Sequence, residues 1–353
     1  MASAGVSFAY LAILAFSPVG DSLERALGGD GGRAPWIYVP VVLLIGALFR
    51  FPFRVWGWQH ERAWRFSTQS FSAWLLDWAK ASVLGIALMS LALLALNALA
   101  SAFPSAWPWI ADPGAALLVI VLSFLGPVVF EPLFNRFRPV EDALLVERLR
   151  DLAGRASVRI DQFLVADASR RTKKENAYVS GLGATRRLVV YDTLLARATP
   201  GEIELVVAHE LGHWRARHTL KGTATAALGA AVAVIVLWLL LRSSAVLSAI
   251  HATGPADPGI APFALLIWGV IGLVTDPIGL VISRSWERHA DRGSIELTGN
   301  AAGFAEMERN LSIANLAELA PSRLAYLFSY SHPAPADRIA AAREAVTRPT
   351  TGS

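Results

Sequence analysis

The chain has 353 residues, of which 54% are hydrophobic and only 17% are charged, and its mean hydropathy is +0.45. A soluble domain cannot bury that much apolar surface, so the composition favours an integral-membrane protein whose first partner is the lipid bilayer. There is no cysteine, which excludes disulfides and cysteine-ligated metals. The net charge of +4 forms no basic stripe, so no nucleic-acid partner is expected.

Six apolar stretches predict about six transmembrane helices, because a bilayer core requires roughly 20 mostly apolar helical residues. In chain order they are residues 5–20, 36–49, 81–103, 113–130, 222–241 and 258–274. The first has no basic segment before it and no cleavage site after it, so it either spans the bilayer or lies along its surface. Arginine and lysine gather at 50–80, and the positive-inside rule therefore places this loop, both termini and the catalytic residues at the cytoplasmic face.

The polar stretch at 135–221 predicts a small α+β region. Residues 141–157 have the period of an amphipathic helix. Three short runs are typical of strands, and a turn at 181–183 is expected to join the last two as a hairpin; the runs are 162–166, 176–179 and 187–191. A further helix opens with Thr199, Pro200 and Glu202, which form a capping box with proline in the first turn.

His209 and His213 stand four residues apart in this last helix, and Glu210 follows the first of them. At that spacing two imidazoles project from one helical face and can share one Zn²⁺ ion. Glu210 then reaches the open side of the site, where it can take a proton from an activated water molecule. His218 lies off the face needed for joint chelation. The pattern is typical of zinc metallopeptidases, and the competing interpretation is a pair of surface histidines.

A catalytic zinc site also needs a third protein ligand, which in a chain without cysteine is a distant His, Asp or Glu. Glu287 is the expected ligand, and Asp291, one turn later, is expected to accept the outer N–H of a ligating histidine. His289 is a rival ligand on a neighbouring face, and a solvated acidic face is the plainer interpretation of the carboxylate pair. Asp276 precedes Pro277 and is expected to cap a helix that restarts there after a break.

The order of these motifs carries a resemblance to a known family. The His209–His213 motif, followed by Ser283-Arg284, Glu287 and Ala290-Asp291, resembles the gluzincin membrane proteases typified by the type I CAAX prenyl endopeptidases. Other segments match that family in order, over about residues 65–338: Ser67-Thr68-Gln69-Ser70 with Trp74, Asp77 and Lys80, then Pro132-Leu133-Phe134-Asn135, Asn176-Ala177-Tyr178, Tyr191-Asp192-Thr193-Leu194, and Ser331-His332-Pro333 with Arg338.

The resemblance implies one Zn²⁺ per chain, held by His209, His213 and Glu287, with Glu210 as the general base.

Three more matched residues would act on the substrate. Asn176 would hold its backbone in extended form, and His332 and Arg338 would lie near the metal and stabilise the oxyanion or the peptide carbonyl.

The expected fold is a mostly α, polytopic membrane protein with an inserted α+β, zincin-like catalytic domain that carries a small β-sheet. The expected segments are an N-terminal transmembrane region of about four spans, a first catalytic part with the sheet and the histidine motif, two further transmembrane helices, a second catalytic part with the third ligand, and a tail. Their bounds are 1–134, 135–221, 222–283, 284–346 and 347–353.

The expected function is a zinc metalloendopeptidase that hydrolyses peptide bonds of membrane-associated or lipidated proteins and peptides, as CAAX prenyl proteases do. One alternative is a quality-control metalloprotease of the same clan that cuts misfolded membrane proteins. Another, from outside the enzymes, is an inactive membrane scaffold. The intact residues His209, Glu210, His213 and Glu287 argue against the scaffold.

Overall fold

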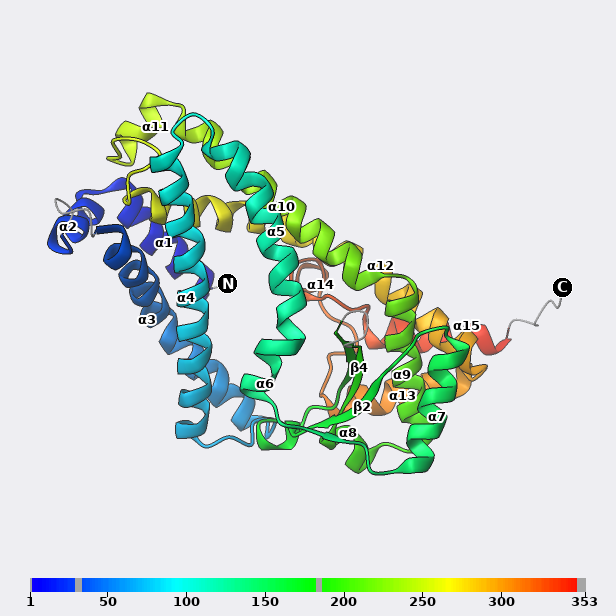
Figure 1. The fold of residues 1–353 in the computed structure, drawn as a ribbon. Coiled ribbons are helices and arrows are strands. Elements are labelled where there is room, and N and C mark those ends of the chain that lie inside the picture. Colours follow the sequence, from blue (N-terminus) through cyan, green and yellow to red (C-terminus); the bar gives the residue numbers. More distant parts are fainter. Residues whose placement is uncertain (1, 29–33, 182–185, 348–353) are drawn as a thin grey trace. The chain divides into compact units, whose positions relative to one another are not determined.

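The computed structural model describes residues 2–28, 34–181 and 186–347, which are mostly helical (Figure 1). The chain divides into two compact units. The first comprises residues 1–64, 69–121 and 224–274, and the second comprises 65–68, 122–223 and 275–353. The segment bounds expected from the sequence stay predictions.

The first unit consists of helices. It contains α1 (Ala2–Phe16), α2 (Pro18–Ala26), α3 (Ala34–Ala63), α4 (Phe71–Ala102) and α11 (Ser244–Ala249), with parts of α5 (Trp107–Leu125), α10 (His218–Leu241) and α12 (Ile260–Thr298). Its largest fully buried side chains are Trp107 and Tyr38. Most apolar side chains of these helices are exposed or half-buried, as expected for helices that face lipid.

Five of the described helices are long and apolar enough to cross a membrane, which agrees with a multi-pass membrane protein. They are α3, α4, α10, α12 and the run Trp107–Phe134 that begins with α5. The predicted span at 5–20 differs, because α1 and α2 are bent by 77° at Ser17. Ser17 caps α2 and Pro18 occupies its first turn, so a new helix starts there. The count reaches six only if this bent pair is one span.

The expected break at Asp276 is wrong, because α12 runs through Pro277 as one helix of 39 residues. Proline is tolerated inside a membrane helix since a full break would expose more backbone polar groups to an apolar environment. One continuous helix therefore carries both an apolar span and Glu287.

The second unit combines a small sheet with helices. Its elements are η1 (Gly126–Phe130), α6 (Glu131–Phe134), β1 (Phe137–Pro139), α7 (Ala143–Arg155), β2 (Gln162–Ala166), η2 (Ala168–Arg170), β3 (Ala177–Ser180), β4 (Arg187–Tyr191), α8 (Asp192–Arg197), α9 (Pro200–Arg215), the second half of α12, α13 (Ala301–Ala314), α14 (Arg323–Ser329) and α15 (Pro335–Thr347).

The sheet has the order β1-β2-β4-β3, in which β2 and β4 are parallel and the other two pairings are antiparallel. The pairing of β3 with β4 confirms the strands of the predicted hairpin, but most of its turn lies at 182–185, outside the described residues. The short strand β1 was not predicted. Three residues with no clear alternation give too little signal to recognise a strand.

The core of the second unit lies between the sheet, α7, α9 and α13. Leu149, Val190, Val207 and Phe304 are fully buried there, one from each of these elements. Burying each such side chain contributes about 1.5–3 kcal/mol. This core fixes the faces of α9 and thereby the direction in which His209 points.

The predicted capping box of α9 is present. The Thr199 hydroxyl accepts the Glu202 N–H at 3.3 Å, and the Glu202 carboxylate accepts the Thr199 N–H at 2.8 Å. Pro200 occupies the first turn. The start of the helix is therefore fixed three turns before the histidine motif.

Thr199→Ala is expected to destabilise the chain by about 1 kcal/mol, because the first turn of α9 loses its hydroxyl acceptor. The measurement is the thermal unfolding midpoint in detergent micelles. Thr199→Ser keeps the acceptor and should unfold close to wild type. A serine variant as unstable as the alanine variant would refute the capping explanation.

Candidate metal centre and active site

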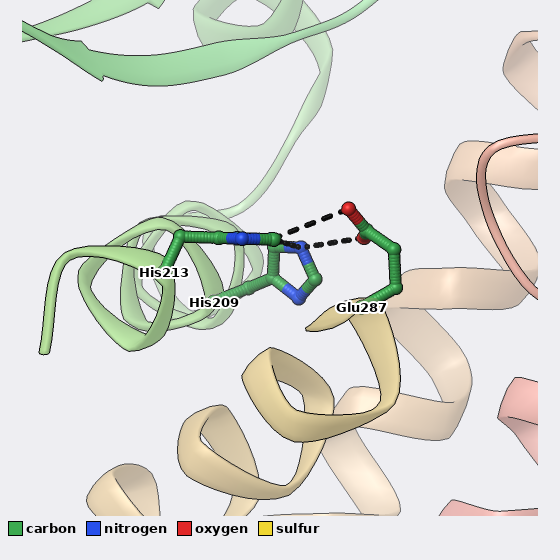
Figure 2. Close-up of side chains that lie close together, drawn as sticks. All are labelled: His209, His213 and Glu287. Atoms are coloured by element: carbon green, nitrogen blue, oxygen red, sulfur yellow. Dashed lines mark hydrogen bonds and ion pairs between the residues drawn. The ribbon is translucent and has the colours of Figure 1, made fainter. Parts of the chain in front are cut away.

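The histidines of the predicted motif project from one face of α9 (Figure 2). The Nε2 atoms of His209 and His213 lie 3.2 Å apart, and the two rings meet edge to face. His209 is buried and His213 is half-buried. The four-residue spacing thus directs two imidazole nitrogens toward one point.

Glu287 reaches the same point from α12 (Figure 2). Its carboxylate oxygens lie 3.2 Å from His209 Nε2 and 3.3 Å from His213 Nε2. Atoms that bind one ion tetrahedrally at about 2.0–2.1 Å are about 3.3 Å from one another. The three side chains therefore have the spacing of ligands around one small cation, and within the described part of the chain no other group of His, Asp and Glu does.

The surroundings of Glu287 also fit a bound cation. This residue is 6% exposed, and its Oε2 atom accepts no hydrogen bond from any described residue. A buried carboxylate oxygen is costly unless a donor or a cation satisfies it. The donor set is two imidazole nitrogens and one carboxylate oxygen, so a divalent ion would find partners of the right chemistry here.

Asp291 lies on the far side of His209, where its Oδ1 is 2.9 Å from the histidine Nδ1. Arg338 of α15 donates to both oxygens of Asp291, at 2.9 and 2.5 Å. Its third nitrogen lies 2.7 Å from Glu308 of α13, which is 3% exposed. The guanidinium is therefore held between two carboxylates. Arg338 is therefore close to the candidate metal ligands, but its guanidinium contacts the carboxylates of Asp291 and Glu308.

His332 approaches from the loop after α14. Arg284 of α12 donates to the carbonyl oxygens of Tyr326 and Tyr330, at 3.0 and 2.6 Å, and so ties this loop to the helix that bears Glu287. His332 Nε2 then lies 3.4 Å from Glu287 Oε2, and its side chain is 60% exposed. An exposed imidazole beside the ligand group can contact a bound substrate.

Glu210 and Asn176 are the remaining predicted site residues. Burial raises the pKa of the Glu210 carboxyl, and the neighbouring His209 and His213 oppose this shift. Asn176 is exposed and directly precedes β3, the edge strand of the sheet, and its carbonyl oxygen accepts the Tyr191 N–H at 3.0 Å. An edge strand has one row of backbone groups available to an extended chain.

His218, which the sequence places off the chelating face, contacts the ligand His213 directly. Its Nδ1 lies 3.0 Å from Nδ1 of His213, and its ring is stacked on Trp286 at 5.0 Å with 7° between the planes. Metal binding through His213 Nε2 requires the proton on Nδ1, so His213 would donate to His218. His218 reaches this place because Arg217, with φ 55°, turns the chain. The rival ligand His289 lies beside His218 and outside the ligand group.

α9 and α12 cross closely at Gly212. A Cβ atom on Gly212 would meet Ala290 Cα at 3.1 Å and its carbonyl oxygen at 3.2 Å. The buried hydroxyl of Ser294 donates to the Leu205 carbonyl oxygen at 2.8 Å across the same pair of helices. Glu287 lies one turn before Ala290, so this crossing brings it to the histidines.

Two family models match the chain in succession. The model of the CAAX prenyl protease N-terminal region, with five membrane helices, matches residues 23–136. The model of peptidase family M48 matches residues 139–346, which include every residue of the ligand group. The chain belongs to peptidase family M48. It is an integral-membrane metalloprotease that resembles CAAX prenyl proteases.

Individual proteins agree with this assignment. The chain is 29% identical to the uncharacterized metalloprotease YhfN of Bacillus subtilis, over 86% of this chain and 71% of that protein. It is 28% identical to CAAX prenyl protease 1 of Saccharomyces cerevisiae, over 80% of this chain and 65% of the yeast protein. The crystal structure of S. mikatae Ste24p superimposes with a TM-score of 0.79 at 25% identity, and the match covers 88% of this chain and 75% of that one.

Gly212→Ala is expected to weaken metal binding, because the added methyl group must push α9 and α12 apart and stretch the ligand group. Overpacking of this kind costs about 1–3 kcal/mol, and part of that loss should appear in the metal dissociation constant. The measurement is competition with a chelator that reports free metal.

The matched control is Gly293→Ala on the same crossing. Its Cβ would meet Gly212 Cα at 3.8 Å, which is ordinary contact. It should bind metal like wild type. If both variants bind metal equally well, the close approach at Gly212 does not set the ligand geometry.

His218→Ala is expected to weaken metal binding about 10–100-fold, since His213 loses the partner that fixes its tautomer and ring orientation. His218→Asn offers an amide oxygen as acceptor and should restore part of the affinity. Unchanged metal affinity in the alanine variant would contradict this positioning role.

Proposed function

We propose that the chain is a zinc metalloendopeptidase that cuts membrane-associated proteins or peptides, including ones with a lipidated terminus. The observation that carries this proposal is the mutual spacing of the two imidazole nitrogens and the Glu287 carboxylate, within a chain of peptidase family M48. Zinc is the ion proposed, because two histidines and a carboxylate with an open fourth position are a common catalytic zinc site.

His209, His213 and Glu287 would hold the ion. Zn²⁺ when bound supplies a Lewis acid that polarises a carbonyl group and activates water near neutral pH. Glu210 follows the first ligand on α9, and we assign it as the general base that takes the proton of the attacking water and passes it to the leaving amine. Its raised pKa brings the carboxyl nearer to the range in which it can do both.

Asp291 and Arg338 would act through His209. Asp291 Oδ1 lies 2.9 Å from His209 Nδ1, where it would accept the outer N–H of the imidazole and hold Nε2 toward the ion. The bidentate contact with Arg338 fixes Asp291 in turn. We therefore propose Arg338 as a positioning residue. His332 is the exposed donor near the ligand group and the better placed of the two to stabilise the developing oxyanion.

Asn176 and β3 would align the substrate. An extended peptide beside the edge strand would form backbone hydrogen bonds, and the exposed Asn176 side chain could bind its amide groups. We also propose that the site faces the cytoplasm, which the basic loop at 50–80 supports.

Two other functions make different predictions. A quality-control protease of the same clan would cut misfolded membrane proteins whether or not they carry a lipid. An inactive scaffold would cut nothing. The expected catalytic residues His209, Glu210, His213 and Glu287 are all present, which argues against a scaffold. The name of the yeast relative, a CAAX prenyl protease, favours lipidated substrates.

Glu210→Gln should keep the metal and lose roughly 10²–10⁴-fold in kcat/KM, because the amide can neither accept nor return a proton. Bound zinc measured by elemental analysis and cleavage of a peptide substrate together test this. Full cleavage by the variant would refute the assignment of the base.

Glu287→Ala is the complementary variant and should lose the metal itself. His289→Ala should retain it, because His289 lies outside the ligand group. If His289→Ala loses the metal and Glu287→Ala retains it, His289 is the third ligand instead of Glu287.

A peptide with a prenylated cysteine near its C-terminus should be cut faster than the same peptide without the lipid. The comparison is kcat/KM for the two peptides with the chain in lipid nanodiscs. Equal values would favour the quality-control function and leave the zinc chemistry intact.

A further inference from the structure

A pocket separate from the candidate metal centre lies in the second unit, at the point where α9 ends and α10 begins. It has a volume of about 540 Å³. Its lining comes from three places: the turn after α7, the residue before β4, and the link from α9 to α10. Ser157 and Arg217, both with φ 55°, turn the chain at two sides of this pocket.

The lining is positively charged. Arg186, Arg215 and Arg217 all contribute, and no Asp or Glu is among the described residues that line the pocket. Several arginines of the second unit lie beside a carboxylate, as Arg338 does. The side chains of Arg215 and Arg217, by contrast, form no hydrogen bond or ion pair with any residue that the structure describes. Their charge is uncompensated in a concave site.

Arg186 is the fixed member of the three. Its guanidinium lies 4.4 Å above the Trp214 ring and donates to the Arg159 carbonyl oxygen at 3.1 Å. Neither contact neutralises its charge. A guanidinium held flat against an indole loses little side-chain freedom when it binds an anion, and its planar fork matches the oxygens of a phosphate.

The N-terminus of α10 contributes further donors. The Lys221 N–H donates to the Arg217 carbonyl oxygen at 3.0 Å, so the N–H groups of the residues before it in the first turn have no helical acceptor. Thr219 and Leu220 of this turn line the pocket. A 24-residue helix adds the positive end of its dipole to the three arginines.

We infer that this pocket binds a phosphate group, held by Arg186, Arg215 and Arg217. Lipid headgroups are one source of phosphate here, because α10 is a membrane-span candidate and its first turn would lie where a span leaves the bilayer. Leu220 in that turn is 59% exposed. Trp214 beside it is a residue type that prefers the interface of a bilayer. A lipid headgroup and free inorganic phosphate present the same chemistry, and the experiment separates them.

The test uses the full chain and two probes. In nanodiscs of phosphatidylcholine and phosphatidylglycerol in equal parts, native mass spectrometry counts the phosphatidylglycerol that stays bound. In a maltoside detergent, inorganic phosphate is titrated against chloride at equal ionic strength while the unfolding midpoint is recorded. The variants are Arg186→Gln, Arg215→Gln and Arg217→Gln. The control is Arg343→Gln, which removes an exposed arginine of α15 far from this pocket in the sequence.

Each pocket variant should weaken binding roughly tenfold, since each removes charge-assisted hydrogen bonds to the anion. The control should leave binding unchanged. If the pocket variants lose bound phosphatidylglycerol, the ligand is a lipid headgroup. If they lose only the rise in unfolding midpoint that inorganic phosphate causes, the ligand is free phosphate. Either result supports the pocket. Arg215 is exposed, so Arg215→Gln tests the pocket even if Arg186→Gln fails to fold. Binding that none of the three variants weakens, or that Arg343→Gln weakens equally, overturns the inference.

Discussion

The close crossing of α9 and α12 is the contact on which the candidate active site depends. Gly212 has no side chain, and this allows its backbone to approach Ala290 so closely that an added Cβ would lie 3.1 Å from the Ala290 Cα. His209 and His213 flank the glycine on one helix, and Glu287 lies one turn before the alanine on the other. A small residue on each helix thus sets the distance between ligands that are more than seventy positions apart in the sequence.

Charge explains why the same place requires a cation. Glu287, Asp291 and Glu308 are all buried, and Arg338 is the cation in direct contact with two of them. The carboxylates therefore outnumber the guanidinium, and a divalent ion would reduce this excess of negative charge. Buried carboxylates are tolerated only when paired, so metal binding and the stability of this part of the fold are coupled. Burial also raises the pKa of Glu308, which lessens the charge that must be balanced.

The membrane helices and the active site share secondary structure. α10 begins three residues after α9 ends, and α12 carries an apolar span and two site residues in one helix. His218 gains its role from the same connection: the turn at Arg217 returns the chain so that the first residue of α10 contacts the last histidine of α9.

The sequence by itself determined the elements with a strong local signal. The capping box, the four-residue histidine spacing, the strands at 162–166 and 187–191 and the long apolar helices all follow from periodicity and from local hydrogen bonding, which act over a few residues. Glu287 and Asp291 were found because the absence of cysteine left few ligands and because their order resembles a known family.

Only the tertiary structure decided the contacts between distant segments. The assignment of Arg338 to Asp291 and Glu308, the support of His213 by His218 and the unbroken helix at Asp276 each depend on packing or on the apolar surroundings of the chain. A sequence pattern shows which side chains share a face of one helix. It does not show which second helix comes close enough to face them, because that distance is set by small residues such as Gly212 and Ala290, which leave no periodic signal.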